Sequence, residues 1–315
     1  MFTIRAEILR PLVAWLVDAC GGGGTNGTES VSVRMNAATV TLQNITAGNT
    51  IVINIVVPRD ACAAWEAPAD TDPAEHRLAL RPLKVLTDSA ADDICMRLPS
   101  ARNPDRFQLE MRTRGGGILS SASLIALEAT DAYFPVDEIE FETALTATFQ
   151  SRELCASVSH ARALGLEVTE LRATSDAALE LRSTSTGSSS VDEYVVAFAA
   201  VDDPVLFRGG ELDVPPADED GDAPRVKRRA ATTRVARIPN SILDMRCDRR
   251  IYKPLSFKIK FFERLLLRAT FCTTVTLATV VGENGSPFRL VLTPDAEPRV
   301  AICAFVAPAI SNDEM

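Results

Sequence analysis

The sequence is poor in the residues on which most enzyme chemistry depends. Phe, Trp and Tyr make up 6% of its 315 residues, and the only two histidines, His76 and His160, fall in ordinary strand and helix patterns. A phosphate loop, a G-x-S-x-G turn and an H-E-x-x-H pair are all missing. The run Gly21–Gly24 follows a helical pattern, so it predicts a helix end and not a dinucleotide-binding turn. We therefore expect a protein that is not an enzyme and needs no cofactor.

Closely spaced cysteines and long apolar runs are also lacking. The seven cysteines are scattered without a C-x-x-C pair, so neither a metal site nor a disulfide framework is expected. Thiols spread among apolar neighbours are typical of a reducing compartment. No stretch is long and apolar enough to cross a bilayer, so no membrane association is expected.

An excess of positive charge is missing as well. The formal net charge is −9, whereas a protein that coated nucleic acid with its whole surface would be basic. Any contact with nucleic acid must therefore be confined to part of the surface.

What the sequence does contain is one strand-to-helix unit that occurs four times, in two pairs. The first pair is MFTIRAEILRPLVAWLVDACG and ALTATFQSRELCASVSHARALG, and the second is HRLALRPLKVLTDSA and PLSFKIKFFERLLLRAT. Each unit opens with alternating apolar residues and continues with apolar residues at helical spacing. Each also carries Arg or Lys near or within the helical part. A repeated basic helix suggests a curved or ring-shaped body that encircles nucleic acid with these helices on one wall.

The periodicity predicts helices that end near residues 20, 90, 164 and 270. We expect Pro11 in the first turn of the first helix, where proline is tolerated. Residues 30–45 and 49–57 alternate with period two and predict paired strands. The acidic and then basic run at 209–235 predicts a solvent-exposed, disordered insertion.

Residues 114–139 differ in texture from both halves and predict a long connector. RGGG opens the segment, apolar and small residues follow in ILSSASLIALEA, and YFPVDEIE is extended at its proline. An ordered connector with exposed apolar residues would be a docking strip for partner peptides. A plain linker, or an edge strand whose apolar side packs inward, is the alternative.

This order of elements, doubled around a connector, resembles the eukaryotic DNA sliding clamps. These include proliferating cell nuclear antigen and the subunits of the nine-one-one checkpoint clamp. PLSFKIKFFERLLLRATFCTTVTLA resembles the last strand–helix–strand of the family, and VAICAFVAPAISNDEM resembles its closing strand and acidic tail. KVLTDSAADDICMRL resembles its second helix with the next strand, and FPVDEIEFETALTATFQSREL resembles the end of its connector.

The resemblance implies an α+β protein with the DNA-clamp fold. Two similar domains each have two helices on the inner face and β-sheets on the outer face, and a long interdomain connector joins them. The implied boundaries are 1–113 for the N-terminal domain, 114–140 for the connector, 141–310 for the C-terminal domain with its insertion, and 311–315 for an acidic tail. Three subunits would close a ring, with edge strands expected near 103–112 and 178–183.

Two members of the family compete as models for this chain. The C-terminal segments fit the replicative homotrimer, which is a DNA polymerase processivity factor. The start FTIRAEI and the uninterrupted run SVRMNAATVTLQN fit a Hus-type DNA damage checkpoint subunit better, because Asn36-Ala-Ala-Thr replaces the replicative clamp's usual turn. We favour the checkpoint subunit. A β-rich scaffold without a DNA role is a third alternative.

The resemblance implies a set of DNA-facing residues on the four helices. Lys260, Arg264 and Arg268 recur at four-residue spacing and form one stripe, which would contact phosphates without reading bases. The third helix departs from the family, since Ala156, Ser159 and Ala163 stand where basic residues are usual. A solvated helix face is the alternative for the whole set. The remaining members are Arg10, Lys84, Arg152, His160 and Arg162.

The resemblance also implies a pocket for client peptides beneath the connector, with ordinary core packing as the alternative. Its members would be Ile118, Leu119, Leu124, Ile125, Leu127, Val306, Ala307 and Pro308. The implied partners are double-stranded DNA bound without sequence preference, two other clamp subunits, a clamp loader, and polymerases, nucleases, ligase or checkpoint factors. Localisation in the nucleus is expected, and a nuclear import signal or a counter-charge to ADEDGD is the interpretation of Arg225, Lys227, Arg228 and Arg229.

Overall fold

The computed structural model describes most of the chain outside its longest loops. The described residues are 1–20, 30–46, 51–66, 75–100, 103–127, 142–175, 177–185, 193–200, 233–238, 240–248, 251–267, 269–281 and 287–308. Among them, none of the helices combines the length and the apolar character that a bilayer crossing demands. None of the seven cysteines, all of which lie within the described residues, is part of a disulfide.

The fourfold strand-to-helix unit is confirmed. In each unit the chain passes from a strand directly into a helix. In the first three units, the residue before the helix has an extended backbone and its side chain makes no capping hydrogen bond. The units are β1 (Phe2–Arg5) with α1 (Ala6–Ala19), β6 (Glu75–Ala79) with α2 (Leu80–Thr87), β10 (Thr143–Gln150) with α3 (Ser151–Ala163), and β16 (Leu255–Lys258) with α4 (Ile259–Leu267).

The first helix begins earlier than the periodicity predicted. Because α1 starts at Ala6, Pro11 lies inside the helix and not in its first turn. Proline has no N–H, so the helix loses one backbone hydrogen bond there. Packing compensates, since most of α1 is buried, including Leu12, Trp15 and Leu16.

The remaining strands form two sheets in each domain. In the first domain they are β2 (Ser30–Met35), β3 (Thr39–Ile45), β4 (Ile51–Pro58), β5 (Ala64–Trp65), β7 (Asp93–Arg97), β8 (Arg106–Arg112) and β9 (Ile118–Ile125), with a short 3-10 helix η1 (Arg59–Ala61). In the second they are β11 (Val168–Ser175), β12 (Ala178–Thr184), β13 (Glu193–Ala199), β14 (Thr233–Ile238), β15 (Ile242–Cys247), β17 (Thr274–Val280), β18 (Phe288–Leu292) and β19 (Ala301–Val306).

The two domains repeat each other strand for strand. The order β5-β1-β7-β8-β9 in the first domain matches β15-β10-β17-β18-β19 in the second. Likewise β4-β3-β2-β6 matches β13-β12-β11-β16. Strand β14, which pairs with β13, is the one strand of the described residues without a counterpart in the first domain.

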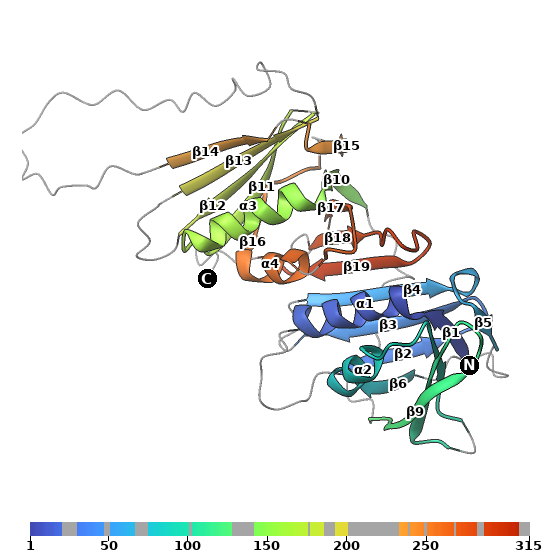
Figure 1. Ribbon diagram of the computed structural model, residues 1–315. Coiled ribbons are helices and arrows are strands. Elements are labelled where there is room, and N and C mark those ends of the chain that lie inside the picture. Colours follow the sequence, from blue (N-terminus) through green and yellow to red (C-terminus); the bar gives the residue numbers. More distant parts are fainter. Residues whose placement is uncertain are drawn as a thin grey trace, which may run out of the picture.

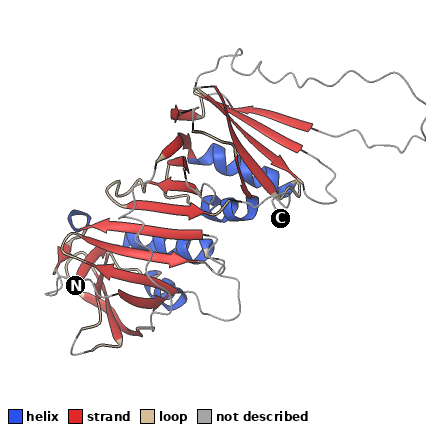
Figure 2. Ribbon diagram, turned by 180° about the vertical axis from the view of Figure 1, so that it is seen from behind, coloured by secondary structure: helices blue, strands red, loops and turns tan. Residues whose placement is uncertain are grey.

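One continuous sheet joins the two domains. Strand β19 pairs antiparallel with β4, from Ala301 opposite Val56 to Val306 opposite Ile51, so nine strands run across the boundary. On the helical side, the fully buried Trp15 of α1 donates its indole N–H to the carbonyl oxygen of Leu265 in α4, at 2.7 Å. All four helices lie on one side of the molecule (Figure 1), and the strands form the opposite side (Figure 2).

Three expectations about the strands need correction. Asn36 ends the run predicted as continuous, because its side-chain Oδ1 accepts hydrogen bonds from the N–H groups of Ala38 and Thr39, both at 2.8 Å. An asparagine turn of this kind separates β2 from β3. The turn therefore weakens one of the two sequence arguments for a checkpoint subunit.

The predicted edges and the predicted connector also change. Strand β8 lies between β7 and β9, and β12 lies between β11 and β13, so neither is an edge. Residues 118–125, expected in the connector, form β9 and extend the first-domain sheet because they pair with β8. The connector residues 128–140, most of the charged insertion 209–235 and the tail 311–315 lie outside the described residues.

Candidate nucleic-acid interface

Helix α4 presents its basic residues to solvent as the sequence predicted. Ile259, Phe262 and Leu266 are buried against the second-domain sheets, while Lys260 and Arg264 are exposed on the opposite face. The ammonium group of Lys260 lies 5.0 Å from the centre of the Phe261 ring. Arg268, the third member of the predicted stripe, lies outside the described residues.

Helix α3 adds three exposed groups beside α4. Arg152, His160 and Arg162 are all exposed. The guanidinium Nε of Arg162 lies 3.5 Å from a carboxylate oxygen of Glu263 on α4, so part of its charge is neutralised. The His160 ring is centred 5.0 Å from the ring of Tyr194 in β13. Together α3 and α4 form a basic face of the second domain.

Helix α1 does not supply the basic group that was predicted. The guanidinium of Arg10 donates hydrogen bonds to the backbone oxygens of Thr87, at 2.7 Å, and of Ser89 and Ala91. Thr87 ends α2, so its carbonyl has no partner within the helix and is a favourable place for a cation; Ser89 and Ala91 lie in the segment that follows. Arg10 therefore fastens α1 to the end of α2 and is not available as a phosphate contact.

Helix α2 carries one predicted and one unpredicted basic residue. Lys84 is half-buried, and Arg81, which was missed, is exposed. The spacing of Arg81 and Lys84, three residues apart on a helix, was the signal that could have identified it. Exposed acidic residues, Glu7 of α1 and Asp88 at the end of α2, share this domain. The helical face of the first domain is thus mixed in charge, and that of the second is predominantly basic.

The structure places the residues of the predicted peptide pocket in two different sheets. Ile118, Leu119, Leu124 and Ile125 belong to β9, at the edge of the first-domain sheet. Val306 is buried at the end of β19, which pairs with β18 and β4, and Ala307 and Pro308 follow it. Leu127 forms an isolated antiparallel bridge with Arg77 of β6. Strand β9 is therefore an exposed apolar edge, separate from the end of β19.

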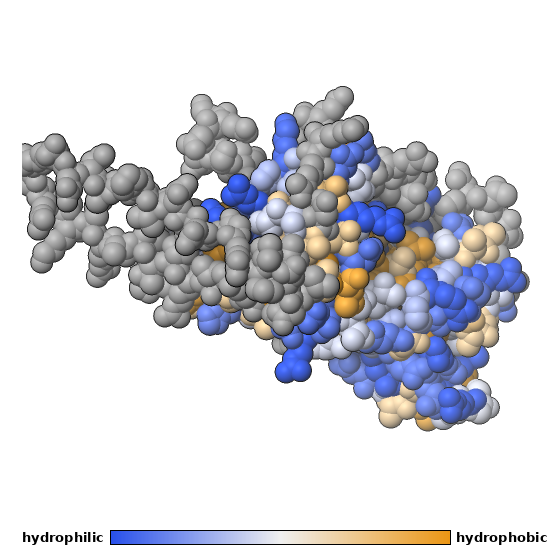
Figure 3. Space-filling model, turned by 90° about the horizontal axis from the view of Figure 1, so that it is seen from above, coloured by the Kyte–Doolittle hydropathy of each residue, from blue (hydrophilic) through white to orange (hydrophobic). Residues whose placement is uncertain are grey.

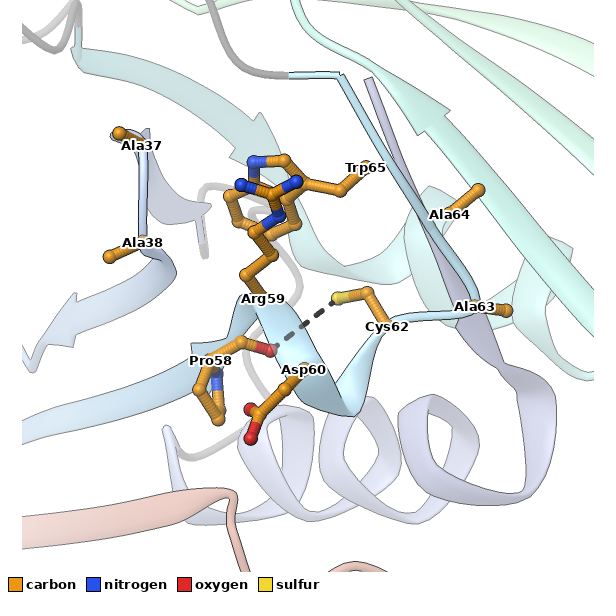
Figure 4. Close-up of a pocket in the computed structure, with 9 residues that line it drawn as sticks. All are labelled: Ala37, Ala38, Pro58, Arg59, Asp60, Cys62, Ala63, Ala64 and Trp65. Carbon is orange, nitrogen blue, oxygen red and sulfur yellow. Dashed lines mark hydrogen bonds between the residues drawn. The ribbon is translucent and has the colours of Figure 1, made fainter.

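A hollow opens beside η1 in the first domain, lined by the turn after β2, the end of β4 and the residues around Trp65 (Figure 4). The thiol of Cys62 donates to the carbonyl oxygen of Pro58, at 3.8 Å. Burial raises the pKa of Cys62 to about 11. The thiol is therefore protonated at neutral pH and is a poor nucleophile.

The described surface contains little else that suggests chemistry. No group of three metal-ligating side chains occurs within the described ranges. Seen from above, most of the described surface is hydrophilic, with apolar residues showing in the middle (Figure 3). The predicted import residues Arg225, Lys227, Arg228 and Arg229 lie outside the described part of the chain.

Known proteins share this fold but little of this sequence. No protein-family model and no curated protein sequence matches the chain. Among solved structures, it is similar to a chain of the PCNA2–PCNA3 complex from Sulfolobus tokodaii, with a TM-score of 0.63 and 10% sequence identity over 98% of both chains. Over nearly its whole length, the chain therefore has the sliding-clamp fold of PCNA.

Proposed function

We propose that this chain is one subunit of a ring-shaped DNA sliding clamp. The observation that carries the proposal is the junction of β4 with β19, in which two repeated domains join edge to edge with their helices on one side. If the same edge-to-edge junction is repeated between chains, the domains follow one another around a ring and all helices lie on its inner wall. The ring does no chemistry and holds its client proteins on duplex DNA.

The basic face of α3 and α4 supports contact with the DNA backbone. Arg152, Lys260 and Arg264 are exposed and lie on two neighbouring helices. Phosphate contacts of this kind position a protein on the duplex without reading its sequence. The acidic remainder of the surface limits binding elsewhere, so the protein stays on DNA by topology more than by affinity.

At a finer level, we place the chain as a Hus-type checkpoint subunit, one of three different chains in a ring that a separate loader opens. The start of the sequence supports this choice, and localisation in the nucleus goes with it. The replicative homotrimer is the second candidate, supported by the C-terminal segments. Light scattering after size exclusion separates them: the replicative clamp gives a trimer alone, and the checkpoint subunit gives a defined complex only with two other chains.

Retention on circular DNA tests the clamp itself. The tagged chain is incubated with nicked circular DNA, ATP and an extract of its own cells, and the DNA is then washed at high salt. A ring remains bound after the wash and is released when a restriction enzyme linearises the circle. Retention that survives linearisation would mean direct binding without a ring, and no retention at all would favour the scaffold without a DNA role. A Lys260→Glu/Arg264→Glu variant serves as a control for charge, and we expect it to load less.

A further inference from the structure

The internal repeat indicates which strands would meet a neighbouring chain if it docked as the two domains do. Residues that lie opposite one another on neighbouring strands form equivalent rows in the two domains, so β9 corresponds to β19. The strand orders of the other sheets make β13 the counterpart of β4. One row is Phe2, Met96, Leu109 and Ala122, and the other is Ala147, Leu277, Leu290 and Ala304. Since β19 binds β4 within the chain, a junction between chains would bring a β9 edge to a β13-type edge.

Strand β9 is open to such a neighbour. In the described part of the chain it pairs with β8 alone, and it lies at the opposite end of the molecule from β13 (Figure 1). Ile118, Leu119 and Ile125 are 59%, 53% and 61% exposed. An exposed apolar edge strand promotes aggregation unless something covers it. Small residues between these positions, Ser120 to Ser123, let another backbone approach closely.

Strand β13 is closed. Its outer edge pairs with β14 in parallel, from Glu193 opposite Thr233 to Phe198 opposite Ile238. A short link to β15 holds β14 in place, because Ser241 donates its N–H to the carbonyl oxygen of Ala199, at 3.0 Å. In the first domain residues 59–63 alone connect β4 to β5, and the edge of β4 is left to β19.

The helices also differ between the two ends: their contact is closed within the chain and is left open beside β9. Counted from the starts of α1 and α3, Trp15 and His160 occupy the same place, and so do Leu265 and Leu86 in α4 and α2. Within the chain Trp15 is buried against Leu265. At the open end Leu86 is half-buried, Val85 beside it is 73% exposed, and this chain offers only an exposed His160 to cover them.

We infer that β9 binds the free edge strand of a different clamp-fold chain, and that β14 occupies the β13 edge, so that copies of this chain do not join head to tail and a ring closes at this end only when the neighbouring subunit displaces β14 from β13. This inference rests on the proposed function for the nature of the assembly. The chemistry of the partner follows from the internal junction: an extended strand that pairs antiparallel with β9, and a large apolar or aromatic side chain, where Trp15 stands here, packed over Leu86 and Val85.

Opening the β13 edge in the full-length chain tests the inference. Proline has no N–H, and neighbouring residues of a strand point their N–H groups in opposite directions. A Val235→Pro/Ala236→Pro variant therefore loses at least one hydrogen bond to β13. Light scattering should find the wild type at the mass of one chain and the variant at two or more. A matched control, Leu243→Pro/Asp244→Pro in the edge strand β15, should stay at one chain.

Two further variants identify the strand that docks. Adding Ile118→Lys/Ile125→Lys to the opened variant should return it to the mass of one chain, because charge on an edge blocks pairing. Adding His160→Trp should tighten the self-association at least tenfold. A folded opened variant, checked by circular dichroism, that stays at one chain overturns the inference. So does a wild type that self-associates and loses this property with the β14 prolines, because β14 itself would then be the docking edge.

Retention on circular DNA tests the proposed function separately from the assignment of the two edges. Self-association of the opened variant without any retention on circular DNA keeps the assignment of the two edges and removes the DNA role. Retention of a homotrimeric wild type on circular DNA keeps the clamp and overturns the closed edge.

Discussion

The two edges of the repeated sheet differ in what covers them. At the middle of the molecule β4 is covered by β19, and Trp15 seals the helices with a buried hydrogen bond. At the far end the equivalent β13 is covered by β14, and an exposed His160 stands in place of Trp15. In this duplicated fold, one edge is therefore used for the junction within the chain and the equivalent edge is covered by an added strand. The two ends of the chain are not equivalent as docking surfaces.

The largest expected effect is at the closed junction. Trp15→Ala removes a fully buried indole and leaves a cavity, so it should lower the free energy of unfolding by about 3–5 kcal/mol. His160→Ala, at the matching exposed place, should change it by less than about 0.5 kcal/mol. Urea denaturation of both variants measures the contrast. Similar losses in the two would mean that the helical contacts are not as unequal as the repeat indicates.

The basic residues of the two domains should separate into structural and DNA-binding groups. Arg10→Gln breaks hydrogen bonds to three backbone oxygens and should cost about 1–3 kcal/mol of stability, with little change in the salt dependence of DNA binding. Lys260→Gln/Arg264→Gln should leave stability within about 0.5 kcal/mol. The double variant should lower the slope of log K against log salt by about 1.8. Salt titrations on duplex DNA would contradict the separation if Arg10→Gln lowered that slope equally.

The loop between β18 and β19, residues 293–300, contacts the first domain at Arg5 and Asp60. It should make the stability of the β4–β19 junction depend on pH. Glu297 is buried between Arg299 and Arg5, and the hydrogen bonds from Arg299 are the main cause that lowers its pKa below 4.5. A carboxylate with a lowered pKa stabilises the folded state above its unfolded-state pKa, and this is lost as the pH falls through the folded-state pKa. The corresponding loop of the open end, Thr113 to Gly117, contains no carboxylate.

Glu297→Gln should therefore lower the melting temperature at pH 7 by about 2–4 °C, the shift that about 1 kcal/mol causes in a domain of this size. The difference from wild type should shrink as the pH falls below 4.5. Thermal melts at a series of pH values provide the measurement. A difference that stays constant down to pH 2.5 would show that the carboxylate charge contributes nothing to the junction.

The smallest effect on stability is expected at the open end. Val85→Lys changes an exposed side chain and should alter the free energy of unfolding by less than about 0.5 kcal/mol. It should nevertheless weaken binding to a copy whose β13 edge has been opened, because it puts charge into the contact over α2. Val281→Lys, exposed but away from α2 and β9, is the matched control. Equal binding by the two variants would remove α2 from the contact.

The local apolar periodicity of the sequence predicted the strand-to-helix units. The positions of β9 and β14 depend on pairing with other strands, which periodicity does not show. The four strand-to-helix units could be predicted because each holds its own apolar pattern, as in residues 255–267. Strand β9 was predicted only as the alternative to a connector, as an edge strand with its apolar side packed inward, because ILSSASLI lacks the alternation of a half-buried strand; most of its residues are in fact exposed. Strand β14 was missed because its parallel partner is distant in sequence and a charged run precedes it.

The same limit explains the outcome for the candidate site. Lys260 and Arg264 lie where the helical spacing placed them, because burial of the opposite face of α4 fixes their direction. The role of Arg10 could not be predicted, since its three acceptor oxygens belong to the end of α2 and the segment after it. A basic residue on a helix is available to DNA only if no nearby backbone competes for it.

The nine-stranded sheet also has a mechanical consequence. Because its hydrogen-bonded ladder crosses the domain boundary without a break, a bending force is shared among many strands and is not concentrated at a hinge. The covalent chain further holds β4 and β19 together, so a ruptured inner junction re-forms without diffusion, whereas a junction between chains does not. An assembly built from this chain would therefore open at its intermolecular seams and keep each subunit as one stiff arc.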